Sequence, residues 1–330
     1  MSACALRGVE TYFTVVMEDS YESKIAHEDF EPETAFREVA TLANELSDLF
    51  KTELTPRHEA AFENYILHSL AWMVYGSNKI EKAGSSLDIT LKLCVAVFRG
   101  EEIPEEIEEQ DQEYLSLKEN LIHEHLSADT SAVLRNRREV VQHAKAAKFM
   151  MDQLCIRGQD LSEQIILETH RILTYKVDAE PTPWTEYSGV YRSHEVIPYK
   201  MQSMFHELKR DLKEVTTNGT IDPIALASKY AHIFVNIHPF IDGNGRMCRL
   251  ILNSLLLKFG AFIACIGVDE DDRSIYKDVA ANGGALEDLY EDAEEEEKPK
   301  LYKELASYVL AHVKKSMTGL VSEVVNACDV

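Results

Sequence analysis

Apolar residues recur every three or four positions along most of this chain, which is the spacing of amphipathic helices. The clearest stripe consists of Phe62, Tyr65, Ile66, Leu70, Met73 and Val74. Thr55 and Pro56 precede this stripe, and a threonine cap followed by a proline in the first turn is a typical helix start. The pattern therefore predicts a helix that begins near residue 56 and continues to about residue 75.

Similar stripes predict further helices over residues 32–51, 86–99, 130–154, 161–173, 223–237 and 299–315, and another from near residue 202. Residues 181–198 break the helical pattern, because they contain three prolines and a glycine. Alternation around Val190 and Val196 within this stretch predicts a short β-hairpin carried on a loop. The predicted fold class is therefore mainly α, a helical bundle with one small β element.

Charge narrows the range of functions. The chain has 330 residues, with 34 lysines and arginines against 57 acidic residues, and its net charge is −23. A surface this acidic repels nucleic-acid backbones, so we expect no general binding of DNA or RNA. The charge does not exclude ATP, because a phosphate group needs only a local cationic pocket. Two glutamate-rich runs, residues 101–112 and 287–297, are interpreted as solvated linkers.

Cysteine usage and hydropathy predict an intracellular protein, cytoplasmic or nuclear. The six cysteines, at positions 4, 94, 155, 248, 265 and 328, contain no C-x-x-C pair and suggest neither a zinc site nor a disulfide framework. No signal peptide is evident in the first residues. The most apolar stretch, residues 250–268, is interrupted by polar residues and is interpreted as a buried helix rather than a membrane span.

The residues best suited to catalysis are concentrated in one segment, His238–Arg249. Pro239 disfavours the helical conformation at the residue before it, so the helix that starts at Pro223 should end near Ile237. His238 would then lie at a helix-to-loop junction and could point outward. Because the pKa of a histidine lies near neutrality, His238 is a candidate general base for an alcohol.

The rest of this segment offers groups that suit a polyphosphate. The glycines of the Gly243–Gly245 turn permit backbone angles that aim successive N–H groups at one point. A helix beginning near Asn244 would add the positive end of its dipole. Arg246 and Arg249 would share one face of that helix, where each could bind phosphate oxygens with two hydrogen bonds. Asp242 beside such a site is a candidate ligand of Mg²⁺.

The segment resembles the signature of the Fic family, H-x-F-x-(D/E)-G-N-G-R-x-x-R, at every fixed position. The resemblance implies a protein adenylyltransferase, in which the motif histidine deprotonates a target hydroxyl that attacks the α-phosphate of ATP. AMP would pass to a tyrosine, threonine or serine side chain, and pyrophosphate would leave. It implies His238 as the base and Asp242 as the ligand of Mg²⁺ or Mn²⁺. The implied phosphate contacts are Gly243, Asn244, Gly245, Arg246 and Arg249.

Two further stretches resemble parts of the Fic core. Residues 189–196 resemble the family's flap, a hairpin that docks the target segment by strand addition. The flap residues that the resemblance implies are Gly189, Tyr191, Arg192 and Val196. Pro198 departs from the pattern, since an aliphatic residue is expected there. Tyr276 and Asn282 resemble the residues that line the adenine pocket, with looser spacing.

Ser77 and Glu81 resemble the family's inhibitory motif, (S/T)-x-x-x-E-(G/N). Four residues apart, both side chains can face the same side of a helix. Glu81 could then pair with Arg249 and occupy the guanidinium meant for the γ-phosphate, which makes the protein an autoinhibited enzyme. Lys82 stands where glycine or asparagine is expected, so the helix stop is expected to shift to Gly84. A glutamate facing solvent remains the ordinary alternative.

The resemblance also implies how the chain is organised and what it binds. We predict an N-terminal helical region with the inhibitory motif over residues 1–120, a Fic catalytic core over 121–285, and an acidic linker with a C-terminal helix over 286–330. The expected partners are ATP and protein substrates, with possible self-modification and a possible homodimer. No membrane partner is expected.

Three alternatives to adenylylation of target proteins remain open. One is removal of AMP from a modified protein, in which Glu81 would position a water molecule. Another is transfer of a different group, such as UMP, phosphate or phosphocholine. The third, of another class, is a nucleotide-binding interaction module without turnover, against which the intact His238 and Asp242 argue.

Overall fold

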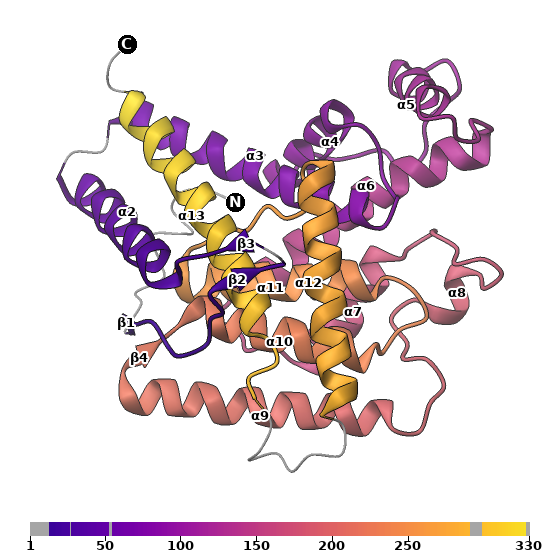
Figure 1. Cartoon of the computed structure of the whole chain (residues 1–330). Coiled ribbons are helices and arrows are strands. Elements are labelled where there is room, and N and C mark those ends of the chain that lie inside the picture. Colours follow the sequence, from indigo (N-terminus) through magenta and orange to yellow (C-terminus); the bar gives the residue numbers. More distant parts are fainter. Residues whose placement is uncertain (1–12, 27, 53–54, 291–298, 328–330) are drawn as a thin grey trace.

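Helices account for almost all of the regular structure, as the apolar spacing predicts (Figure 1). The computed structural model describes residues 13–26, 28–52, 55–290 and 299–327. The α-helices are α2 (Pro32–Thr52), α3 (Pro56–Ile80), α4 (Leu87–Arg99), α5 (Gln112–His123), α6 (Thr130–Met151), α7 (Glu163–Leu173), α8 (Trp184–Tyr187), α9 (Ile197–Asn218), α10 (Pro223–Ile237), α11 (Asn244–Gly260), α12 (Glu270–Leu289) and α13 (Lys303–Asn326). A π-helical turn, Asp152–Ile156, extends α6. The mainly α fold class is confirmed.

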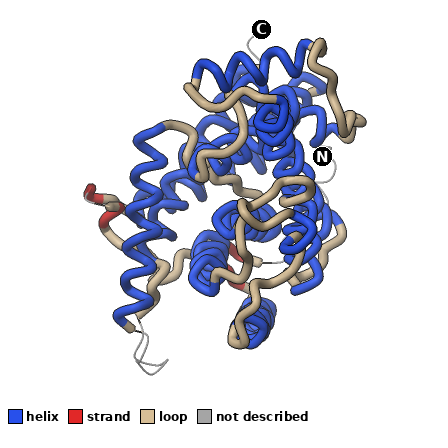
Figure 2. The backbone as a smooth tube through the Cα atoms, turned by 90° about the vertical axis from the view of Figure 1, so that its right-hand side faces the viewer, coloured by secondary structure: helices blue, strands red, loops and turns tan. Residues whose placement is uncertain are grey.

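The strands are very short. β1 (Thr14–Val15) pairs in parallel with β4 (Thr220–Ile221), and β2 (Lys24–Ile25) pairs antiparallel with β3 (Glu28–Asp29). Figure 2 shows that the rest of the described chain is helix joined by loops.

The hairpin predicted within residues 181–198 does not form as paired strands. The described part of this stretch holds the short helix α8 and a loop, with only an isolated bridge between Ala179 and Thr182 beside it. Its backbone donors are bonded elsewhere, because the N–H of Gly189 donates to the ring of His170 and that of Arg192 donates to the carbonyl of Pro239. The loop is therefore tied to the helical core rather than to itself.

Helix α10 begins and ends as its sequence predicts. The side chain of Asp222 accepts hydrogen bonds from the N–H groups of Ile224 (3.1 Å) and Ala225 (3.0 Å), and Pro223 occupies the first turn. The helix ends at Ile237, and His238 caps it in the left-handed conformation. Helices α10 and α11 pack on each other, and nearly all residues of α11 are buried. The loop between them is thus anchored at both ends in the core.

Besides α8, and α9, which begins at Ile197 rather than near residue 202, the helices α5, α12 and α13 differ from the predicted pattern. α5 was missed because its few buried residues, Tyr114, Leu117 and Leu121, follow a glutamate-rich stretch and contact only a small satellite core. α12 was missed because two adjacent glycines at 283 and 284 interrupt its pattern. α13 extends to Asn326, beyond the predicted residue 315, since its buried stripe continues where it packs on α2 and α3.

One hydrophobic core joins helices from all three predicted segments, from Tyr21 to Val324. In Figure 1 α13 crosses the front of the bundle beside α2, α3 and α10. The second acidic run from residue 291 onward, together with Cys4 and Cys328, lies outside the described residues. Among the residues that are described, no helix combines the length and the apolar character that crossing a bilayer requires.

Candidate functional site

The loop between α10 and α11 presents His238 at the surface. His238 has φ 50° and ψ 58°, the left-handed region that few residues other than glycine adopt. Its N–H donates to the carbonyl of Phe234 (3.2 Å), while its own carbonyl accepts from Nε of Arg192 (2.7 Å). The backbone is therefore held on both sides, and His238 itself is exposed.

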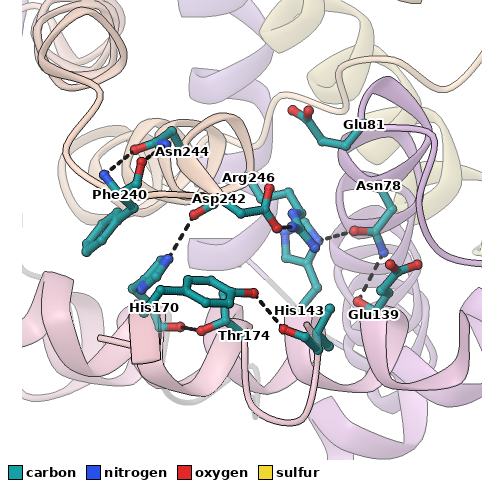
Figure 3. A network of polar contacts seen from close by, with 12 residues as sticks. Asn78, Glu81, Glu139, His143, His170, Thr174, Phe240, Asp242, Asn244 and Arg246 are labelled. Carbon is teal, nitrogen blue, oxygen red and sulfur yellow. Dashed lines mark hydrogen bonds and ion pairs between the residues drawn. The ribbon is translucent and has the colours of Figure 1, made fainter. Parts of the chain in front are cut away.

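Asn244 fixes the shape of the loop with one side chain. Its Oδ1 accepts from the N–H of Phe240 (2.9 Å), and its Nδ2 donates to the carbonyl of the same residue (2.8 Å) (Figure 3). Phe240 is fully buried and stacks on the ring of His170, with the ring centroids 3.6 Å apart. The asparagine that the motif requires is thus a structural brace of the loop.

His170 on α7, which is not among the predicted site residues, holds the loop through a hydrogen bond to Asp242. Its Nδ1 accepts a hydrogen bond from the N–H of Gly189 (2.9 Å), so its Nε2 carries the hydrogen and donates to the carbonyl of Asp242 (2.9 Å). Burial is the main cause that lowers the pKa of His170 to about 4, which keeps the ring neutral near pH 7. The neutral ring is the form that can make both bonds at once.

Asp242 and Arg246 form an ion pair at the start of α11. NH2 of Arg246 lies 2.9 Å from Oδ2 of Asp242, whose side chain is 39% exposed. Arg246 is almost completely buried, and its Nε and NH1 have no hydrogen-bond partner among the described residues. Buried guanidinium donors without acceptors are costly, and a bound anion would satisfy them.

The backbone at the start of α11 also suits an anion. Gly243 precedes the helix with φ 81°, and a Cβ at this position would lie 3.4 Å from Nε2 of His170. The helix begins at Asn244, so its first N–H groups have no partner within the helix. Together with the guanidinium of Arg246, these donors would suit an anion.

Arg249 is occupied by residues of α3 and α12. Its Nε donates to Oγ of Ser77 (2.8 Å), and its NH2 donates to the carbonyl of Ser77 (3.0 Å) and to Oε1 of Glu81 (2.6 Å). Its NH1 approaches the hydroxyl of Tyr276 (3.4 Å), and the guanidinium lies over the tyrosine ring. Burial opposes the charge of Arg249, but Tyr276 and Glu81 outweigh it and raise its pKa.

The end of α3 differs from the prediction at Lys82. The helix does not continue to Gly84: it ends at Ile80, Glu81 caps it, and Lys82 itself adopts φ 56°. The N–H of Ala83 donates to the carbonyl of Asn78 (2.9 Å), which completes a helix-ending turn around Lys82. Because the cap does not shift, the carboxylate of Glu81 points at Arg249.

The four residues assigned to the flap differ in burial and in their contacts. Gly189 has φ 71°, and a Cβ there would lie 2.9 Å from Cβ of Arg171. Tyr191 is half-buried, Arg192 holds the backbone of the loop, and Val196 is exposed at the start of α9. These residues therefore connect the loop to α7 and α9.

Of the two residues assigned to the adenine pocket, the structure brings only Tyr276 to the arginines. Tyr276 is buried against Arg249 on α12. Asn282 lies further along the same helix and is exposed, and its amide donates to the carboxylate of Glu304 on α13 (3.1 Å and 3.4 Å).

Comparisons with known proteins agree with this arrangement. Residues 160–256 match the Fic/DOC family. A Fido domain-containing protein of Dictyostelium discoideum is 38% identical over 95 residues, which cover 26% of this chain and 65% of that protein. The protein adenylyltransferase fic-1 of Caenorhabditis elegans is 32% identical over 130 residues, which cover 38% of this chain and 25% of that protein.

The likeness of fold extends over most of the chain. A Fic domain containing signaling protein from Bacteroides thetaiotaomicron has a solved structure that superposes with a TM-score of 0.62 and 17% identity, covering 89% of this chain and 98% of that one. An exposed histidine, a braced glycine loop and two arginines on one helix define the site as a Fic motif. The site thus lies within residues 160–256, the segment that matches the Fic/DOC family.

Proposed function

We propose that this protein transfers AMP from ATP to tyrosine, threonine or serine hydroxyls of target proteins, itself included, and that Glu81 restrains the reaction. The observation that carries the proposal is the convergence of the exposed His238, the α11 N-terminus and the unpaired donors of Arg246 on one loop. The adenylyltransferase name of the C. elegans relative supports the same activity.

In the proposed reaction, each of these groups has one role. His238 takes the proton of the target hydroxyl, whose oxygen forms a bond to the α-phosphorus of ATP while the bond to the bridging oxygen of pyrophosphate breaks. The α11 N-terminus and Arg246 hold the phosphates and stabilise the charge that develops on them. His170 and Asn244 act through the loop, because they keep its backbone in one shape.

The residues present fit a magnesium ion carried by the nucleotide. Among the described residues no group of three or more histidine, cysteine, aspartate or glutamate side chains could hold a metal alone. Mg²⁺ is often bound by one or two carboxylates together with substrate phosphates, and Asp242 provides one half-exposed carboxylate beside the phosphate site. Bound there, the ion would neutralise phosphate charge.

Glu81 restrains the reaction through Arg249. Ser77, Glu81 and Tyr276 together occupy the donors of this guanidinium, so the γ-phosphate of ATP has to displace the carboxylate before it can bind. The carboxylate is 37% exposed, and solvent access lets it leave the arginine. The contact is therefore reversible, as regulation requires.

The test is incubation with α-labelled ATP and Mg²⁺, comparing wild type, Glu81→Gly and Glu81→Gly with His238→Ala. Strong self-labelling or target labelling in Glu81→Gly alone is the expected result. Equal labelling of wild type and Glu81→Gly would contradict the restraint. Labelling that survives His238→Ala would contradict the role of the base, and no label in any form would contradict AMP transfer.

A further inference from the structure

A buried polar cluster lies behind the end of α3, where an apolar core would be the ordinary arrangement. Asn78, Asn136, Glu139 and His143 are each at most 7% exposed, and they join α3 to α6. None of them belongs to the motif between His238 and Arg249. Buried polar groups are tolerated when they bond one another, and such networks hold backbones in one arrangement.

The first link runs from α6 to the side chain of Asn78. Nδ2 of Asn78 donates to the carbonyl of Glu139 (3.3 Å), so its Oδ1 accepts from Nδ1 of His143 (2.8 Å). Figure 3 shows the ring of His143 joined to Asn78, with Glu81 further along the same chain segment. Because the amide nitrogen of Asn78 donates and its oxygen accepts, the side chain is held in one orientation.

The second link runs from Asn78 to the turn that carries Glu81. The carbonyl of Asn78 accepts from the N–H groups of Glu81 (3.0 Å) and Ala83 (2.9 Å). The same residue thus holds α6 with its side chain and the end of α3 with its backbone. A shift of Asn78 would move the cap on which the Glu81 carboxylate sits.

The third link fixes the far side of the turn. The N–H of Gly84 donates to Oε2 of Glu139 (2.8 Å), and Nδ2 of Asn136 donates to the carbonyl of Gly84. A Cβ at Gly84 would lie 2.8 Å from Nδ2 of Asn78, so the two residues are packed as closely as a glycine allows. Residues 78–84 are therefore held by α6 before and after Glu81.

We propose that His143 and Asn78 are positioning residues of the inhibitory contact: they lock the end of α3 onto α6 and so hold the Glu81 carboxylate on Arg249. This inference rests on the proposed restraint by Glu81. Neither residue touches the reacting atoms. Their effect on AMP transfer should therefore depend on the presence of Glu81.

The test compares four proteins in the α-labelled ATP assay. They are wild type, His143→Leu, Glu81→Gly and the double variant. Leucine removes the donor to Asn78 at similar volume, and we expect labelling about tenfold above wild type, the effect of one lost buried hydrogen bond. With Glu81 already replaced, the same change should alter labelling by less than about twofold. Equal effects in both backgrounds, or none in either, would overturn the proposal.

Two further variants separate this role from general loosening of α3. His143→Asn keeps an N–H donor near the position of Nδ1 and should stay within about twofold of wild type. Tyr65→Phe removes another hydrogen bond of α3, from the Tyr65 hydroxyl to the carbonyl of Ser316 (2.7 Å), far from the cap. It should leave labelling unchanged, and a rise equal to that of His143→Leu would contradict the specific role.

Hydrogen exchange tests the positioning role of His143 and Asn78 even if no variant transfers AMP. Absence of transfer in every variant would refute the proposed function alone. The amides of Ala83 and Gly84 should exchange about tenfold faster in His143→Leu than in wild type, while amides of α11 stay protected. Unchanged exchange at these two amides would overturn the positioning role. Faster exchange throughout the protein would do the same, because it would reflect global destabilisation.

Discussion

The carboxylate of Glu81 lies directly over Gly245, in the space that a side chain at this position would fill. A Cβ built on Gly245 would overlap Oε1 of Glu81 and come within 3.2 Å of NH1 of Arg249. The backbone of Gly245 is helical, so its conformation does not require glycine. The second glycine of the motif therefore makes room for the carboxylate of Glu81.

Replacing Gly245 with alanine should thus have opposite effects on stability in two backgrounds. In wild type the new methyl group displaces Glu81 and breaks its bond to Arg249, so the free energy of unfolding should fall by about 1 kcal/mol. In Glu81→Gly the clash is absent, and alanine should stabilise the helix by up to about 1 kcal/mol. Urea unfolding of the four proteins measures this difference. Equal effects in both backgrounds would mean that the carboxylate does not occupy this space.

Lys82→Gly should stabilise the protein. Lys82 holds a left-handed conformation at the end of α3 with an exposed side chain, and a non-glycine residue there costs about 1 kcal/mol. Glycine removes this strain, whereas Lys82→Ala, the matched control, retains it. We expect an increase of about 0.5–1 kcal/mol in the free energy of unfolding for glycine alone. A gain of the same size for alanine would trace the effect to the lost charge instead.

The loop between α10 and α11 was predictable from sequence because its determinants are contiguous. Pro239 ends α10, Gly243 permits the turn, and both arginines follow within one and a half turns of α11. The predicted helix starts at Pro56 and Pro223 are likewise confirmed, since capping depends on neighbours in the chain.

The supports of the loop and of the end of α3 could not be predicted, because they come from distant parts of the chain. His170 lies 72 residues from Asp242, and Asn78 lies 65 residues from His143. The sequence shows only that these polar residues lie within apolar helical stripes. This position suggests that their side chains are buried, but it does not indicate which residues they bond. The predicted hairpin over residues 181–198 was wrong for a related reason. Alternation of apolar and polar residues indicates which side chains are exposed, but it does not determine that the N–H groups of Gly189 and Arg192 bond to other elements.

Asn244→Ala should reduce both stability and nucleotide binding. The two hydrogen bonds to Phe240 close the loop, and their loss should lower the free energy of unfolding by about 2 kcal/mol and weaken ATP binding about tenfold. Asn253 provides a comparison, since its amide makes the same pair of bonds to the backbone of Ala264 (2.8 Å and 3.2 Å), besides one to the carbonyl of Arg249 in its own helix (3.2 Å). Asn253→Ala should lose similar stability with little change in ATP affinity, as measured by calorimetry. Equal losses of affinity would show that general destabilisation, not the loop, sets binding.

His143 should make stability fall as the pH is lowered. Burial, with the positive charges of Arg246 and Arg249, lowers the pKa of this ring well below 6.5. As the pH drops beneath 6.5 the unfolded chain binds a proton at this residue and the folded protein does not, so proton uptake favours unfolding. The contribution approaches about 1.4 kcal/mol per pH unit between 6.5 and the lowered pKa.

The variant His143→Asn isolates this contribution, because it keeps the bond to Asn78 and removes the titration. Other groups titrate alike in both proteins and cancel in the difference of their free energies of unfolding. We expect wild type to lose stability more steeply than the variant below pH 6.5, and the two slopes to coincide above about pH 7.5. Parallel slopes throughout would mean that His143 takes up its proton equally in the folded state. A protonated ring can still donate to Asn78, but its charge would then be repelled by those of Arg246 and Arg249, so parallel slopes would also contradict the placement of these charges near it.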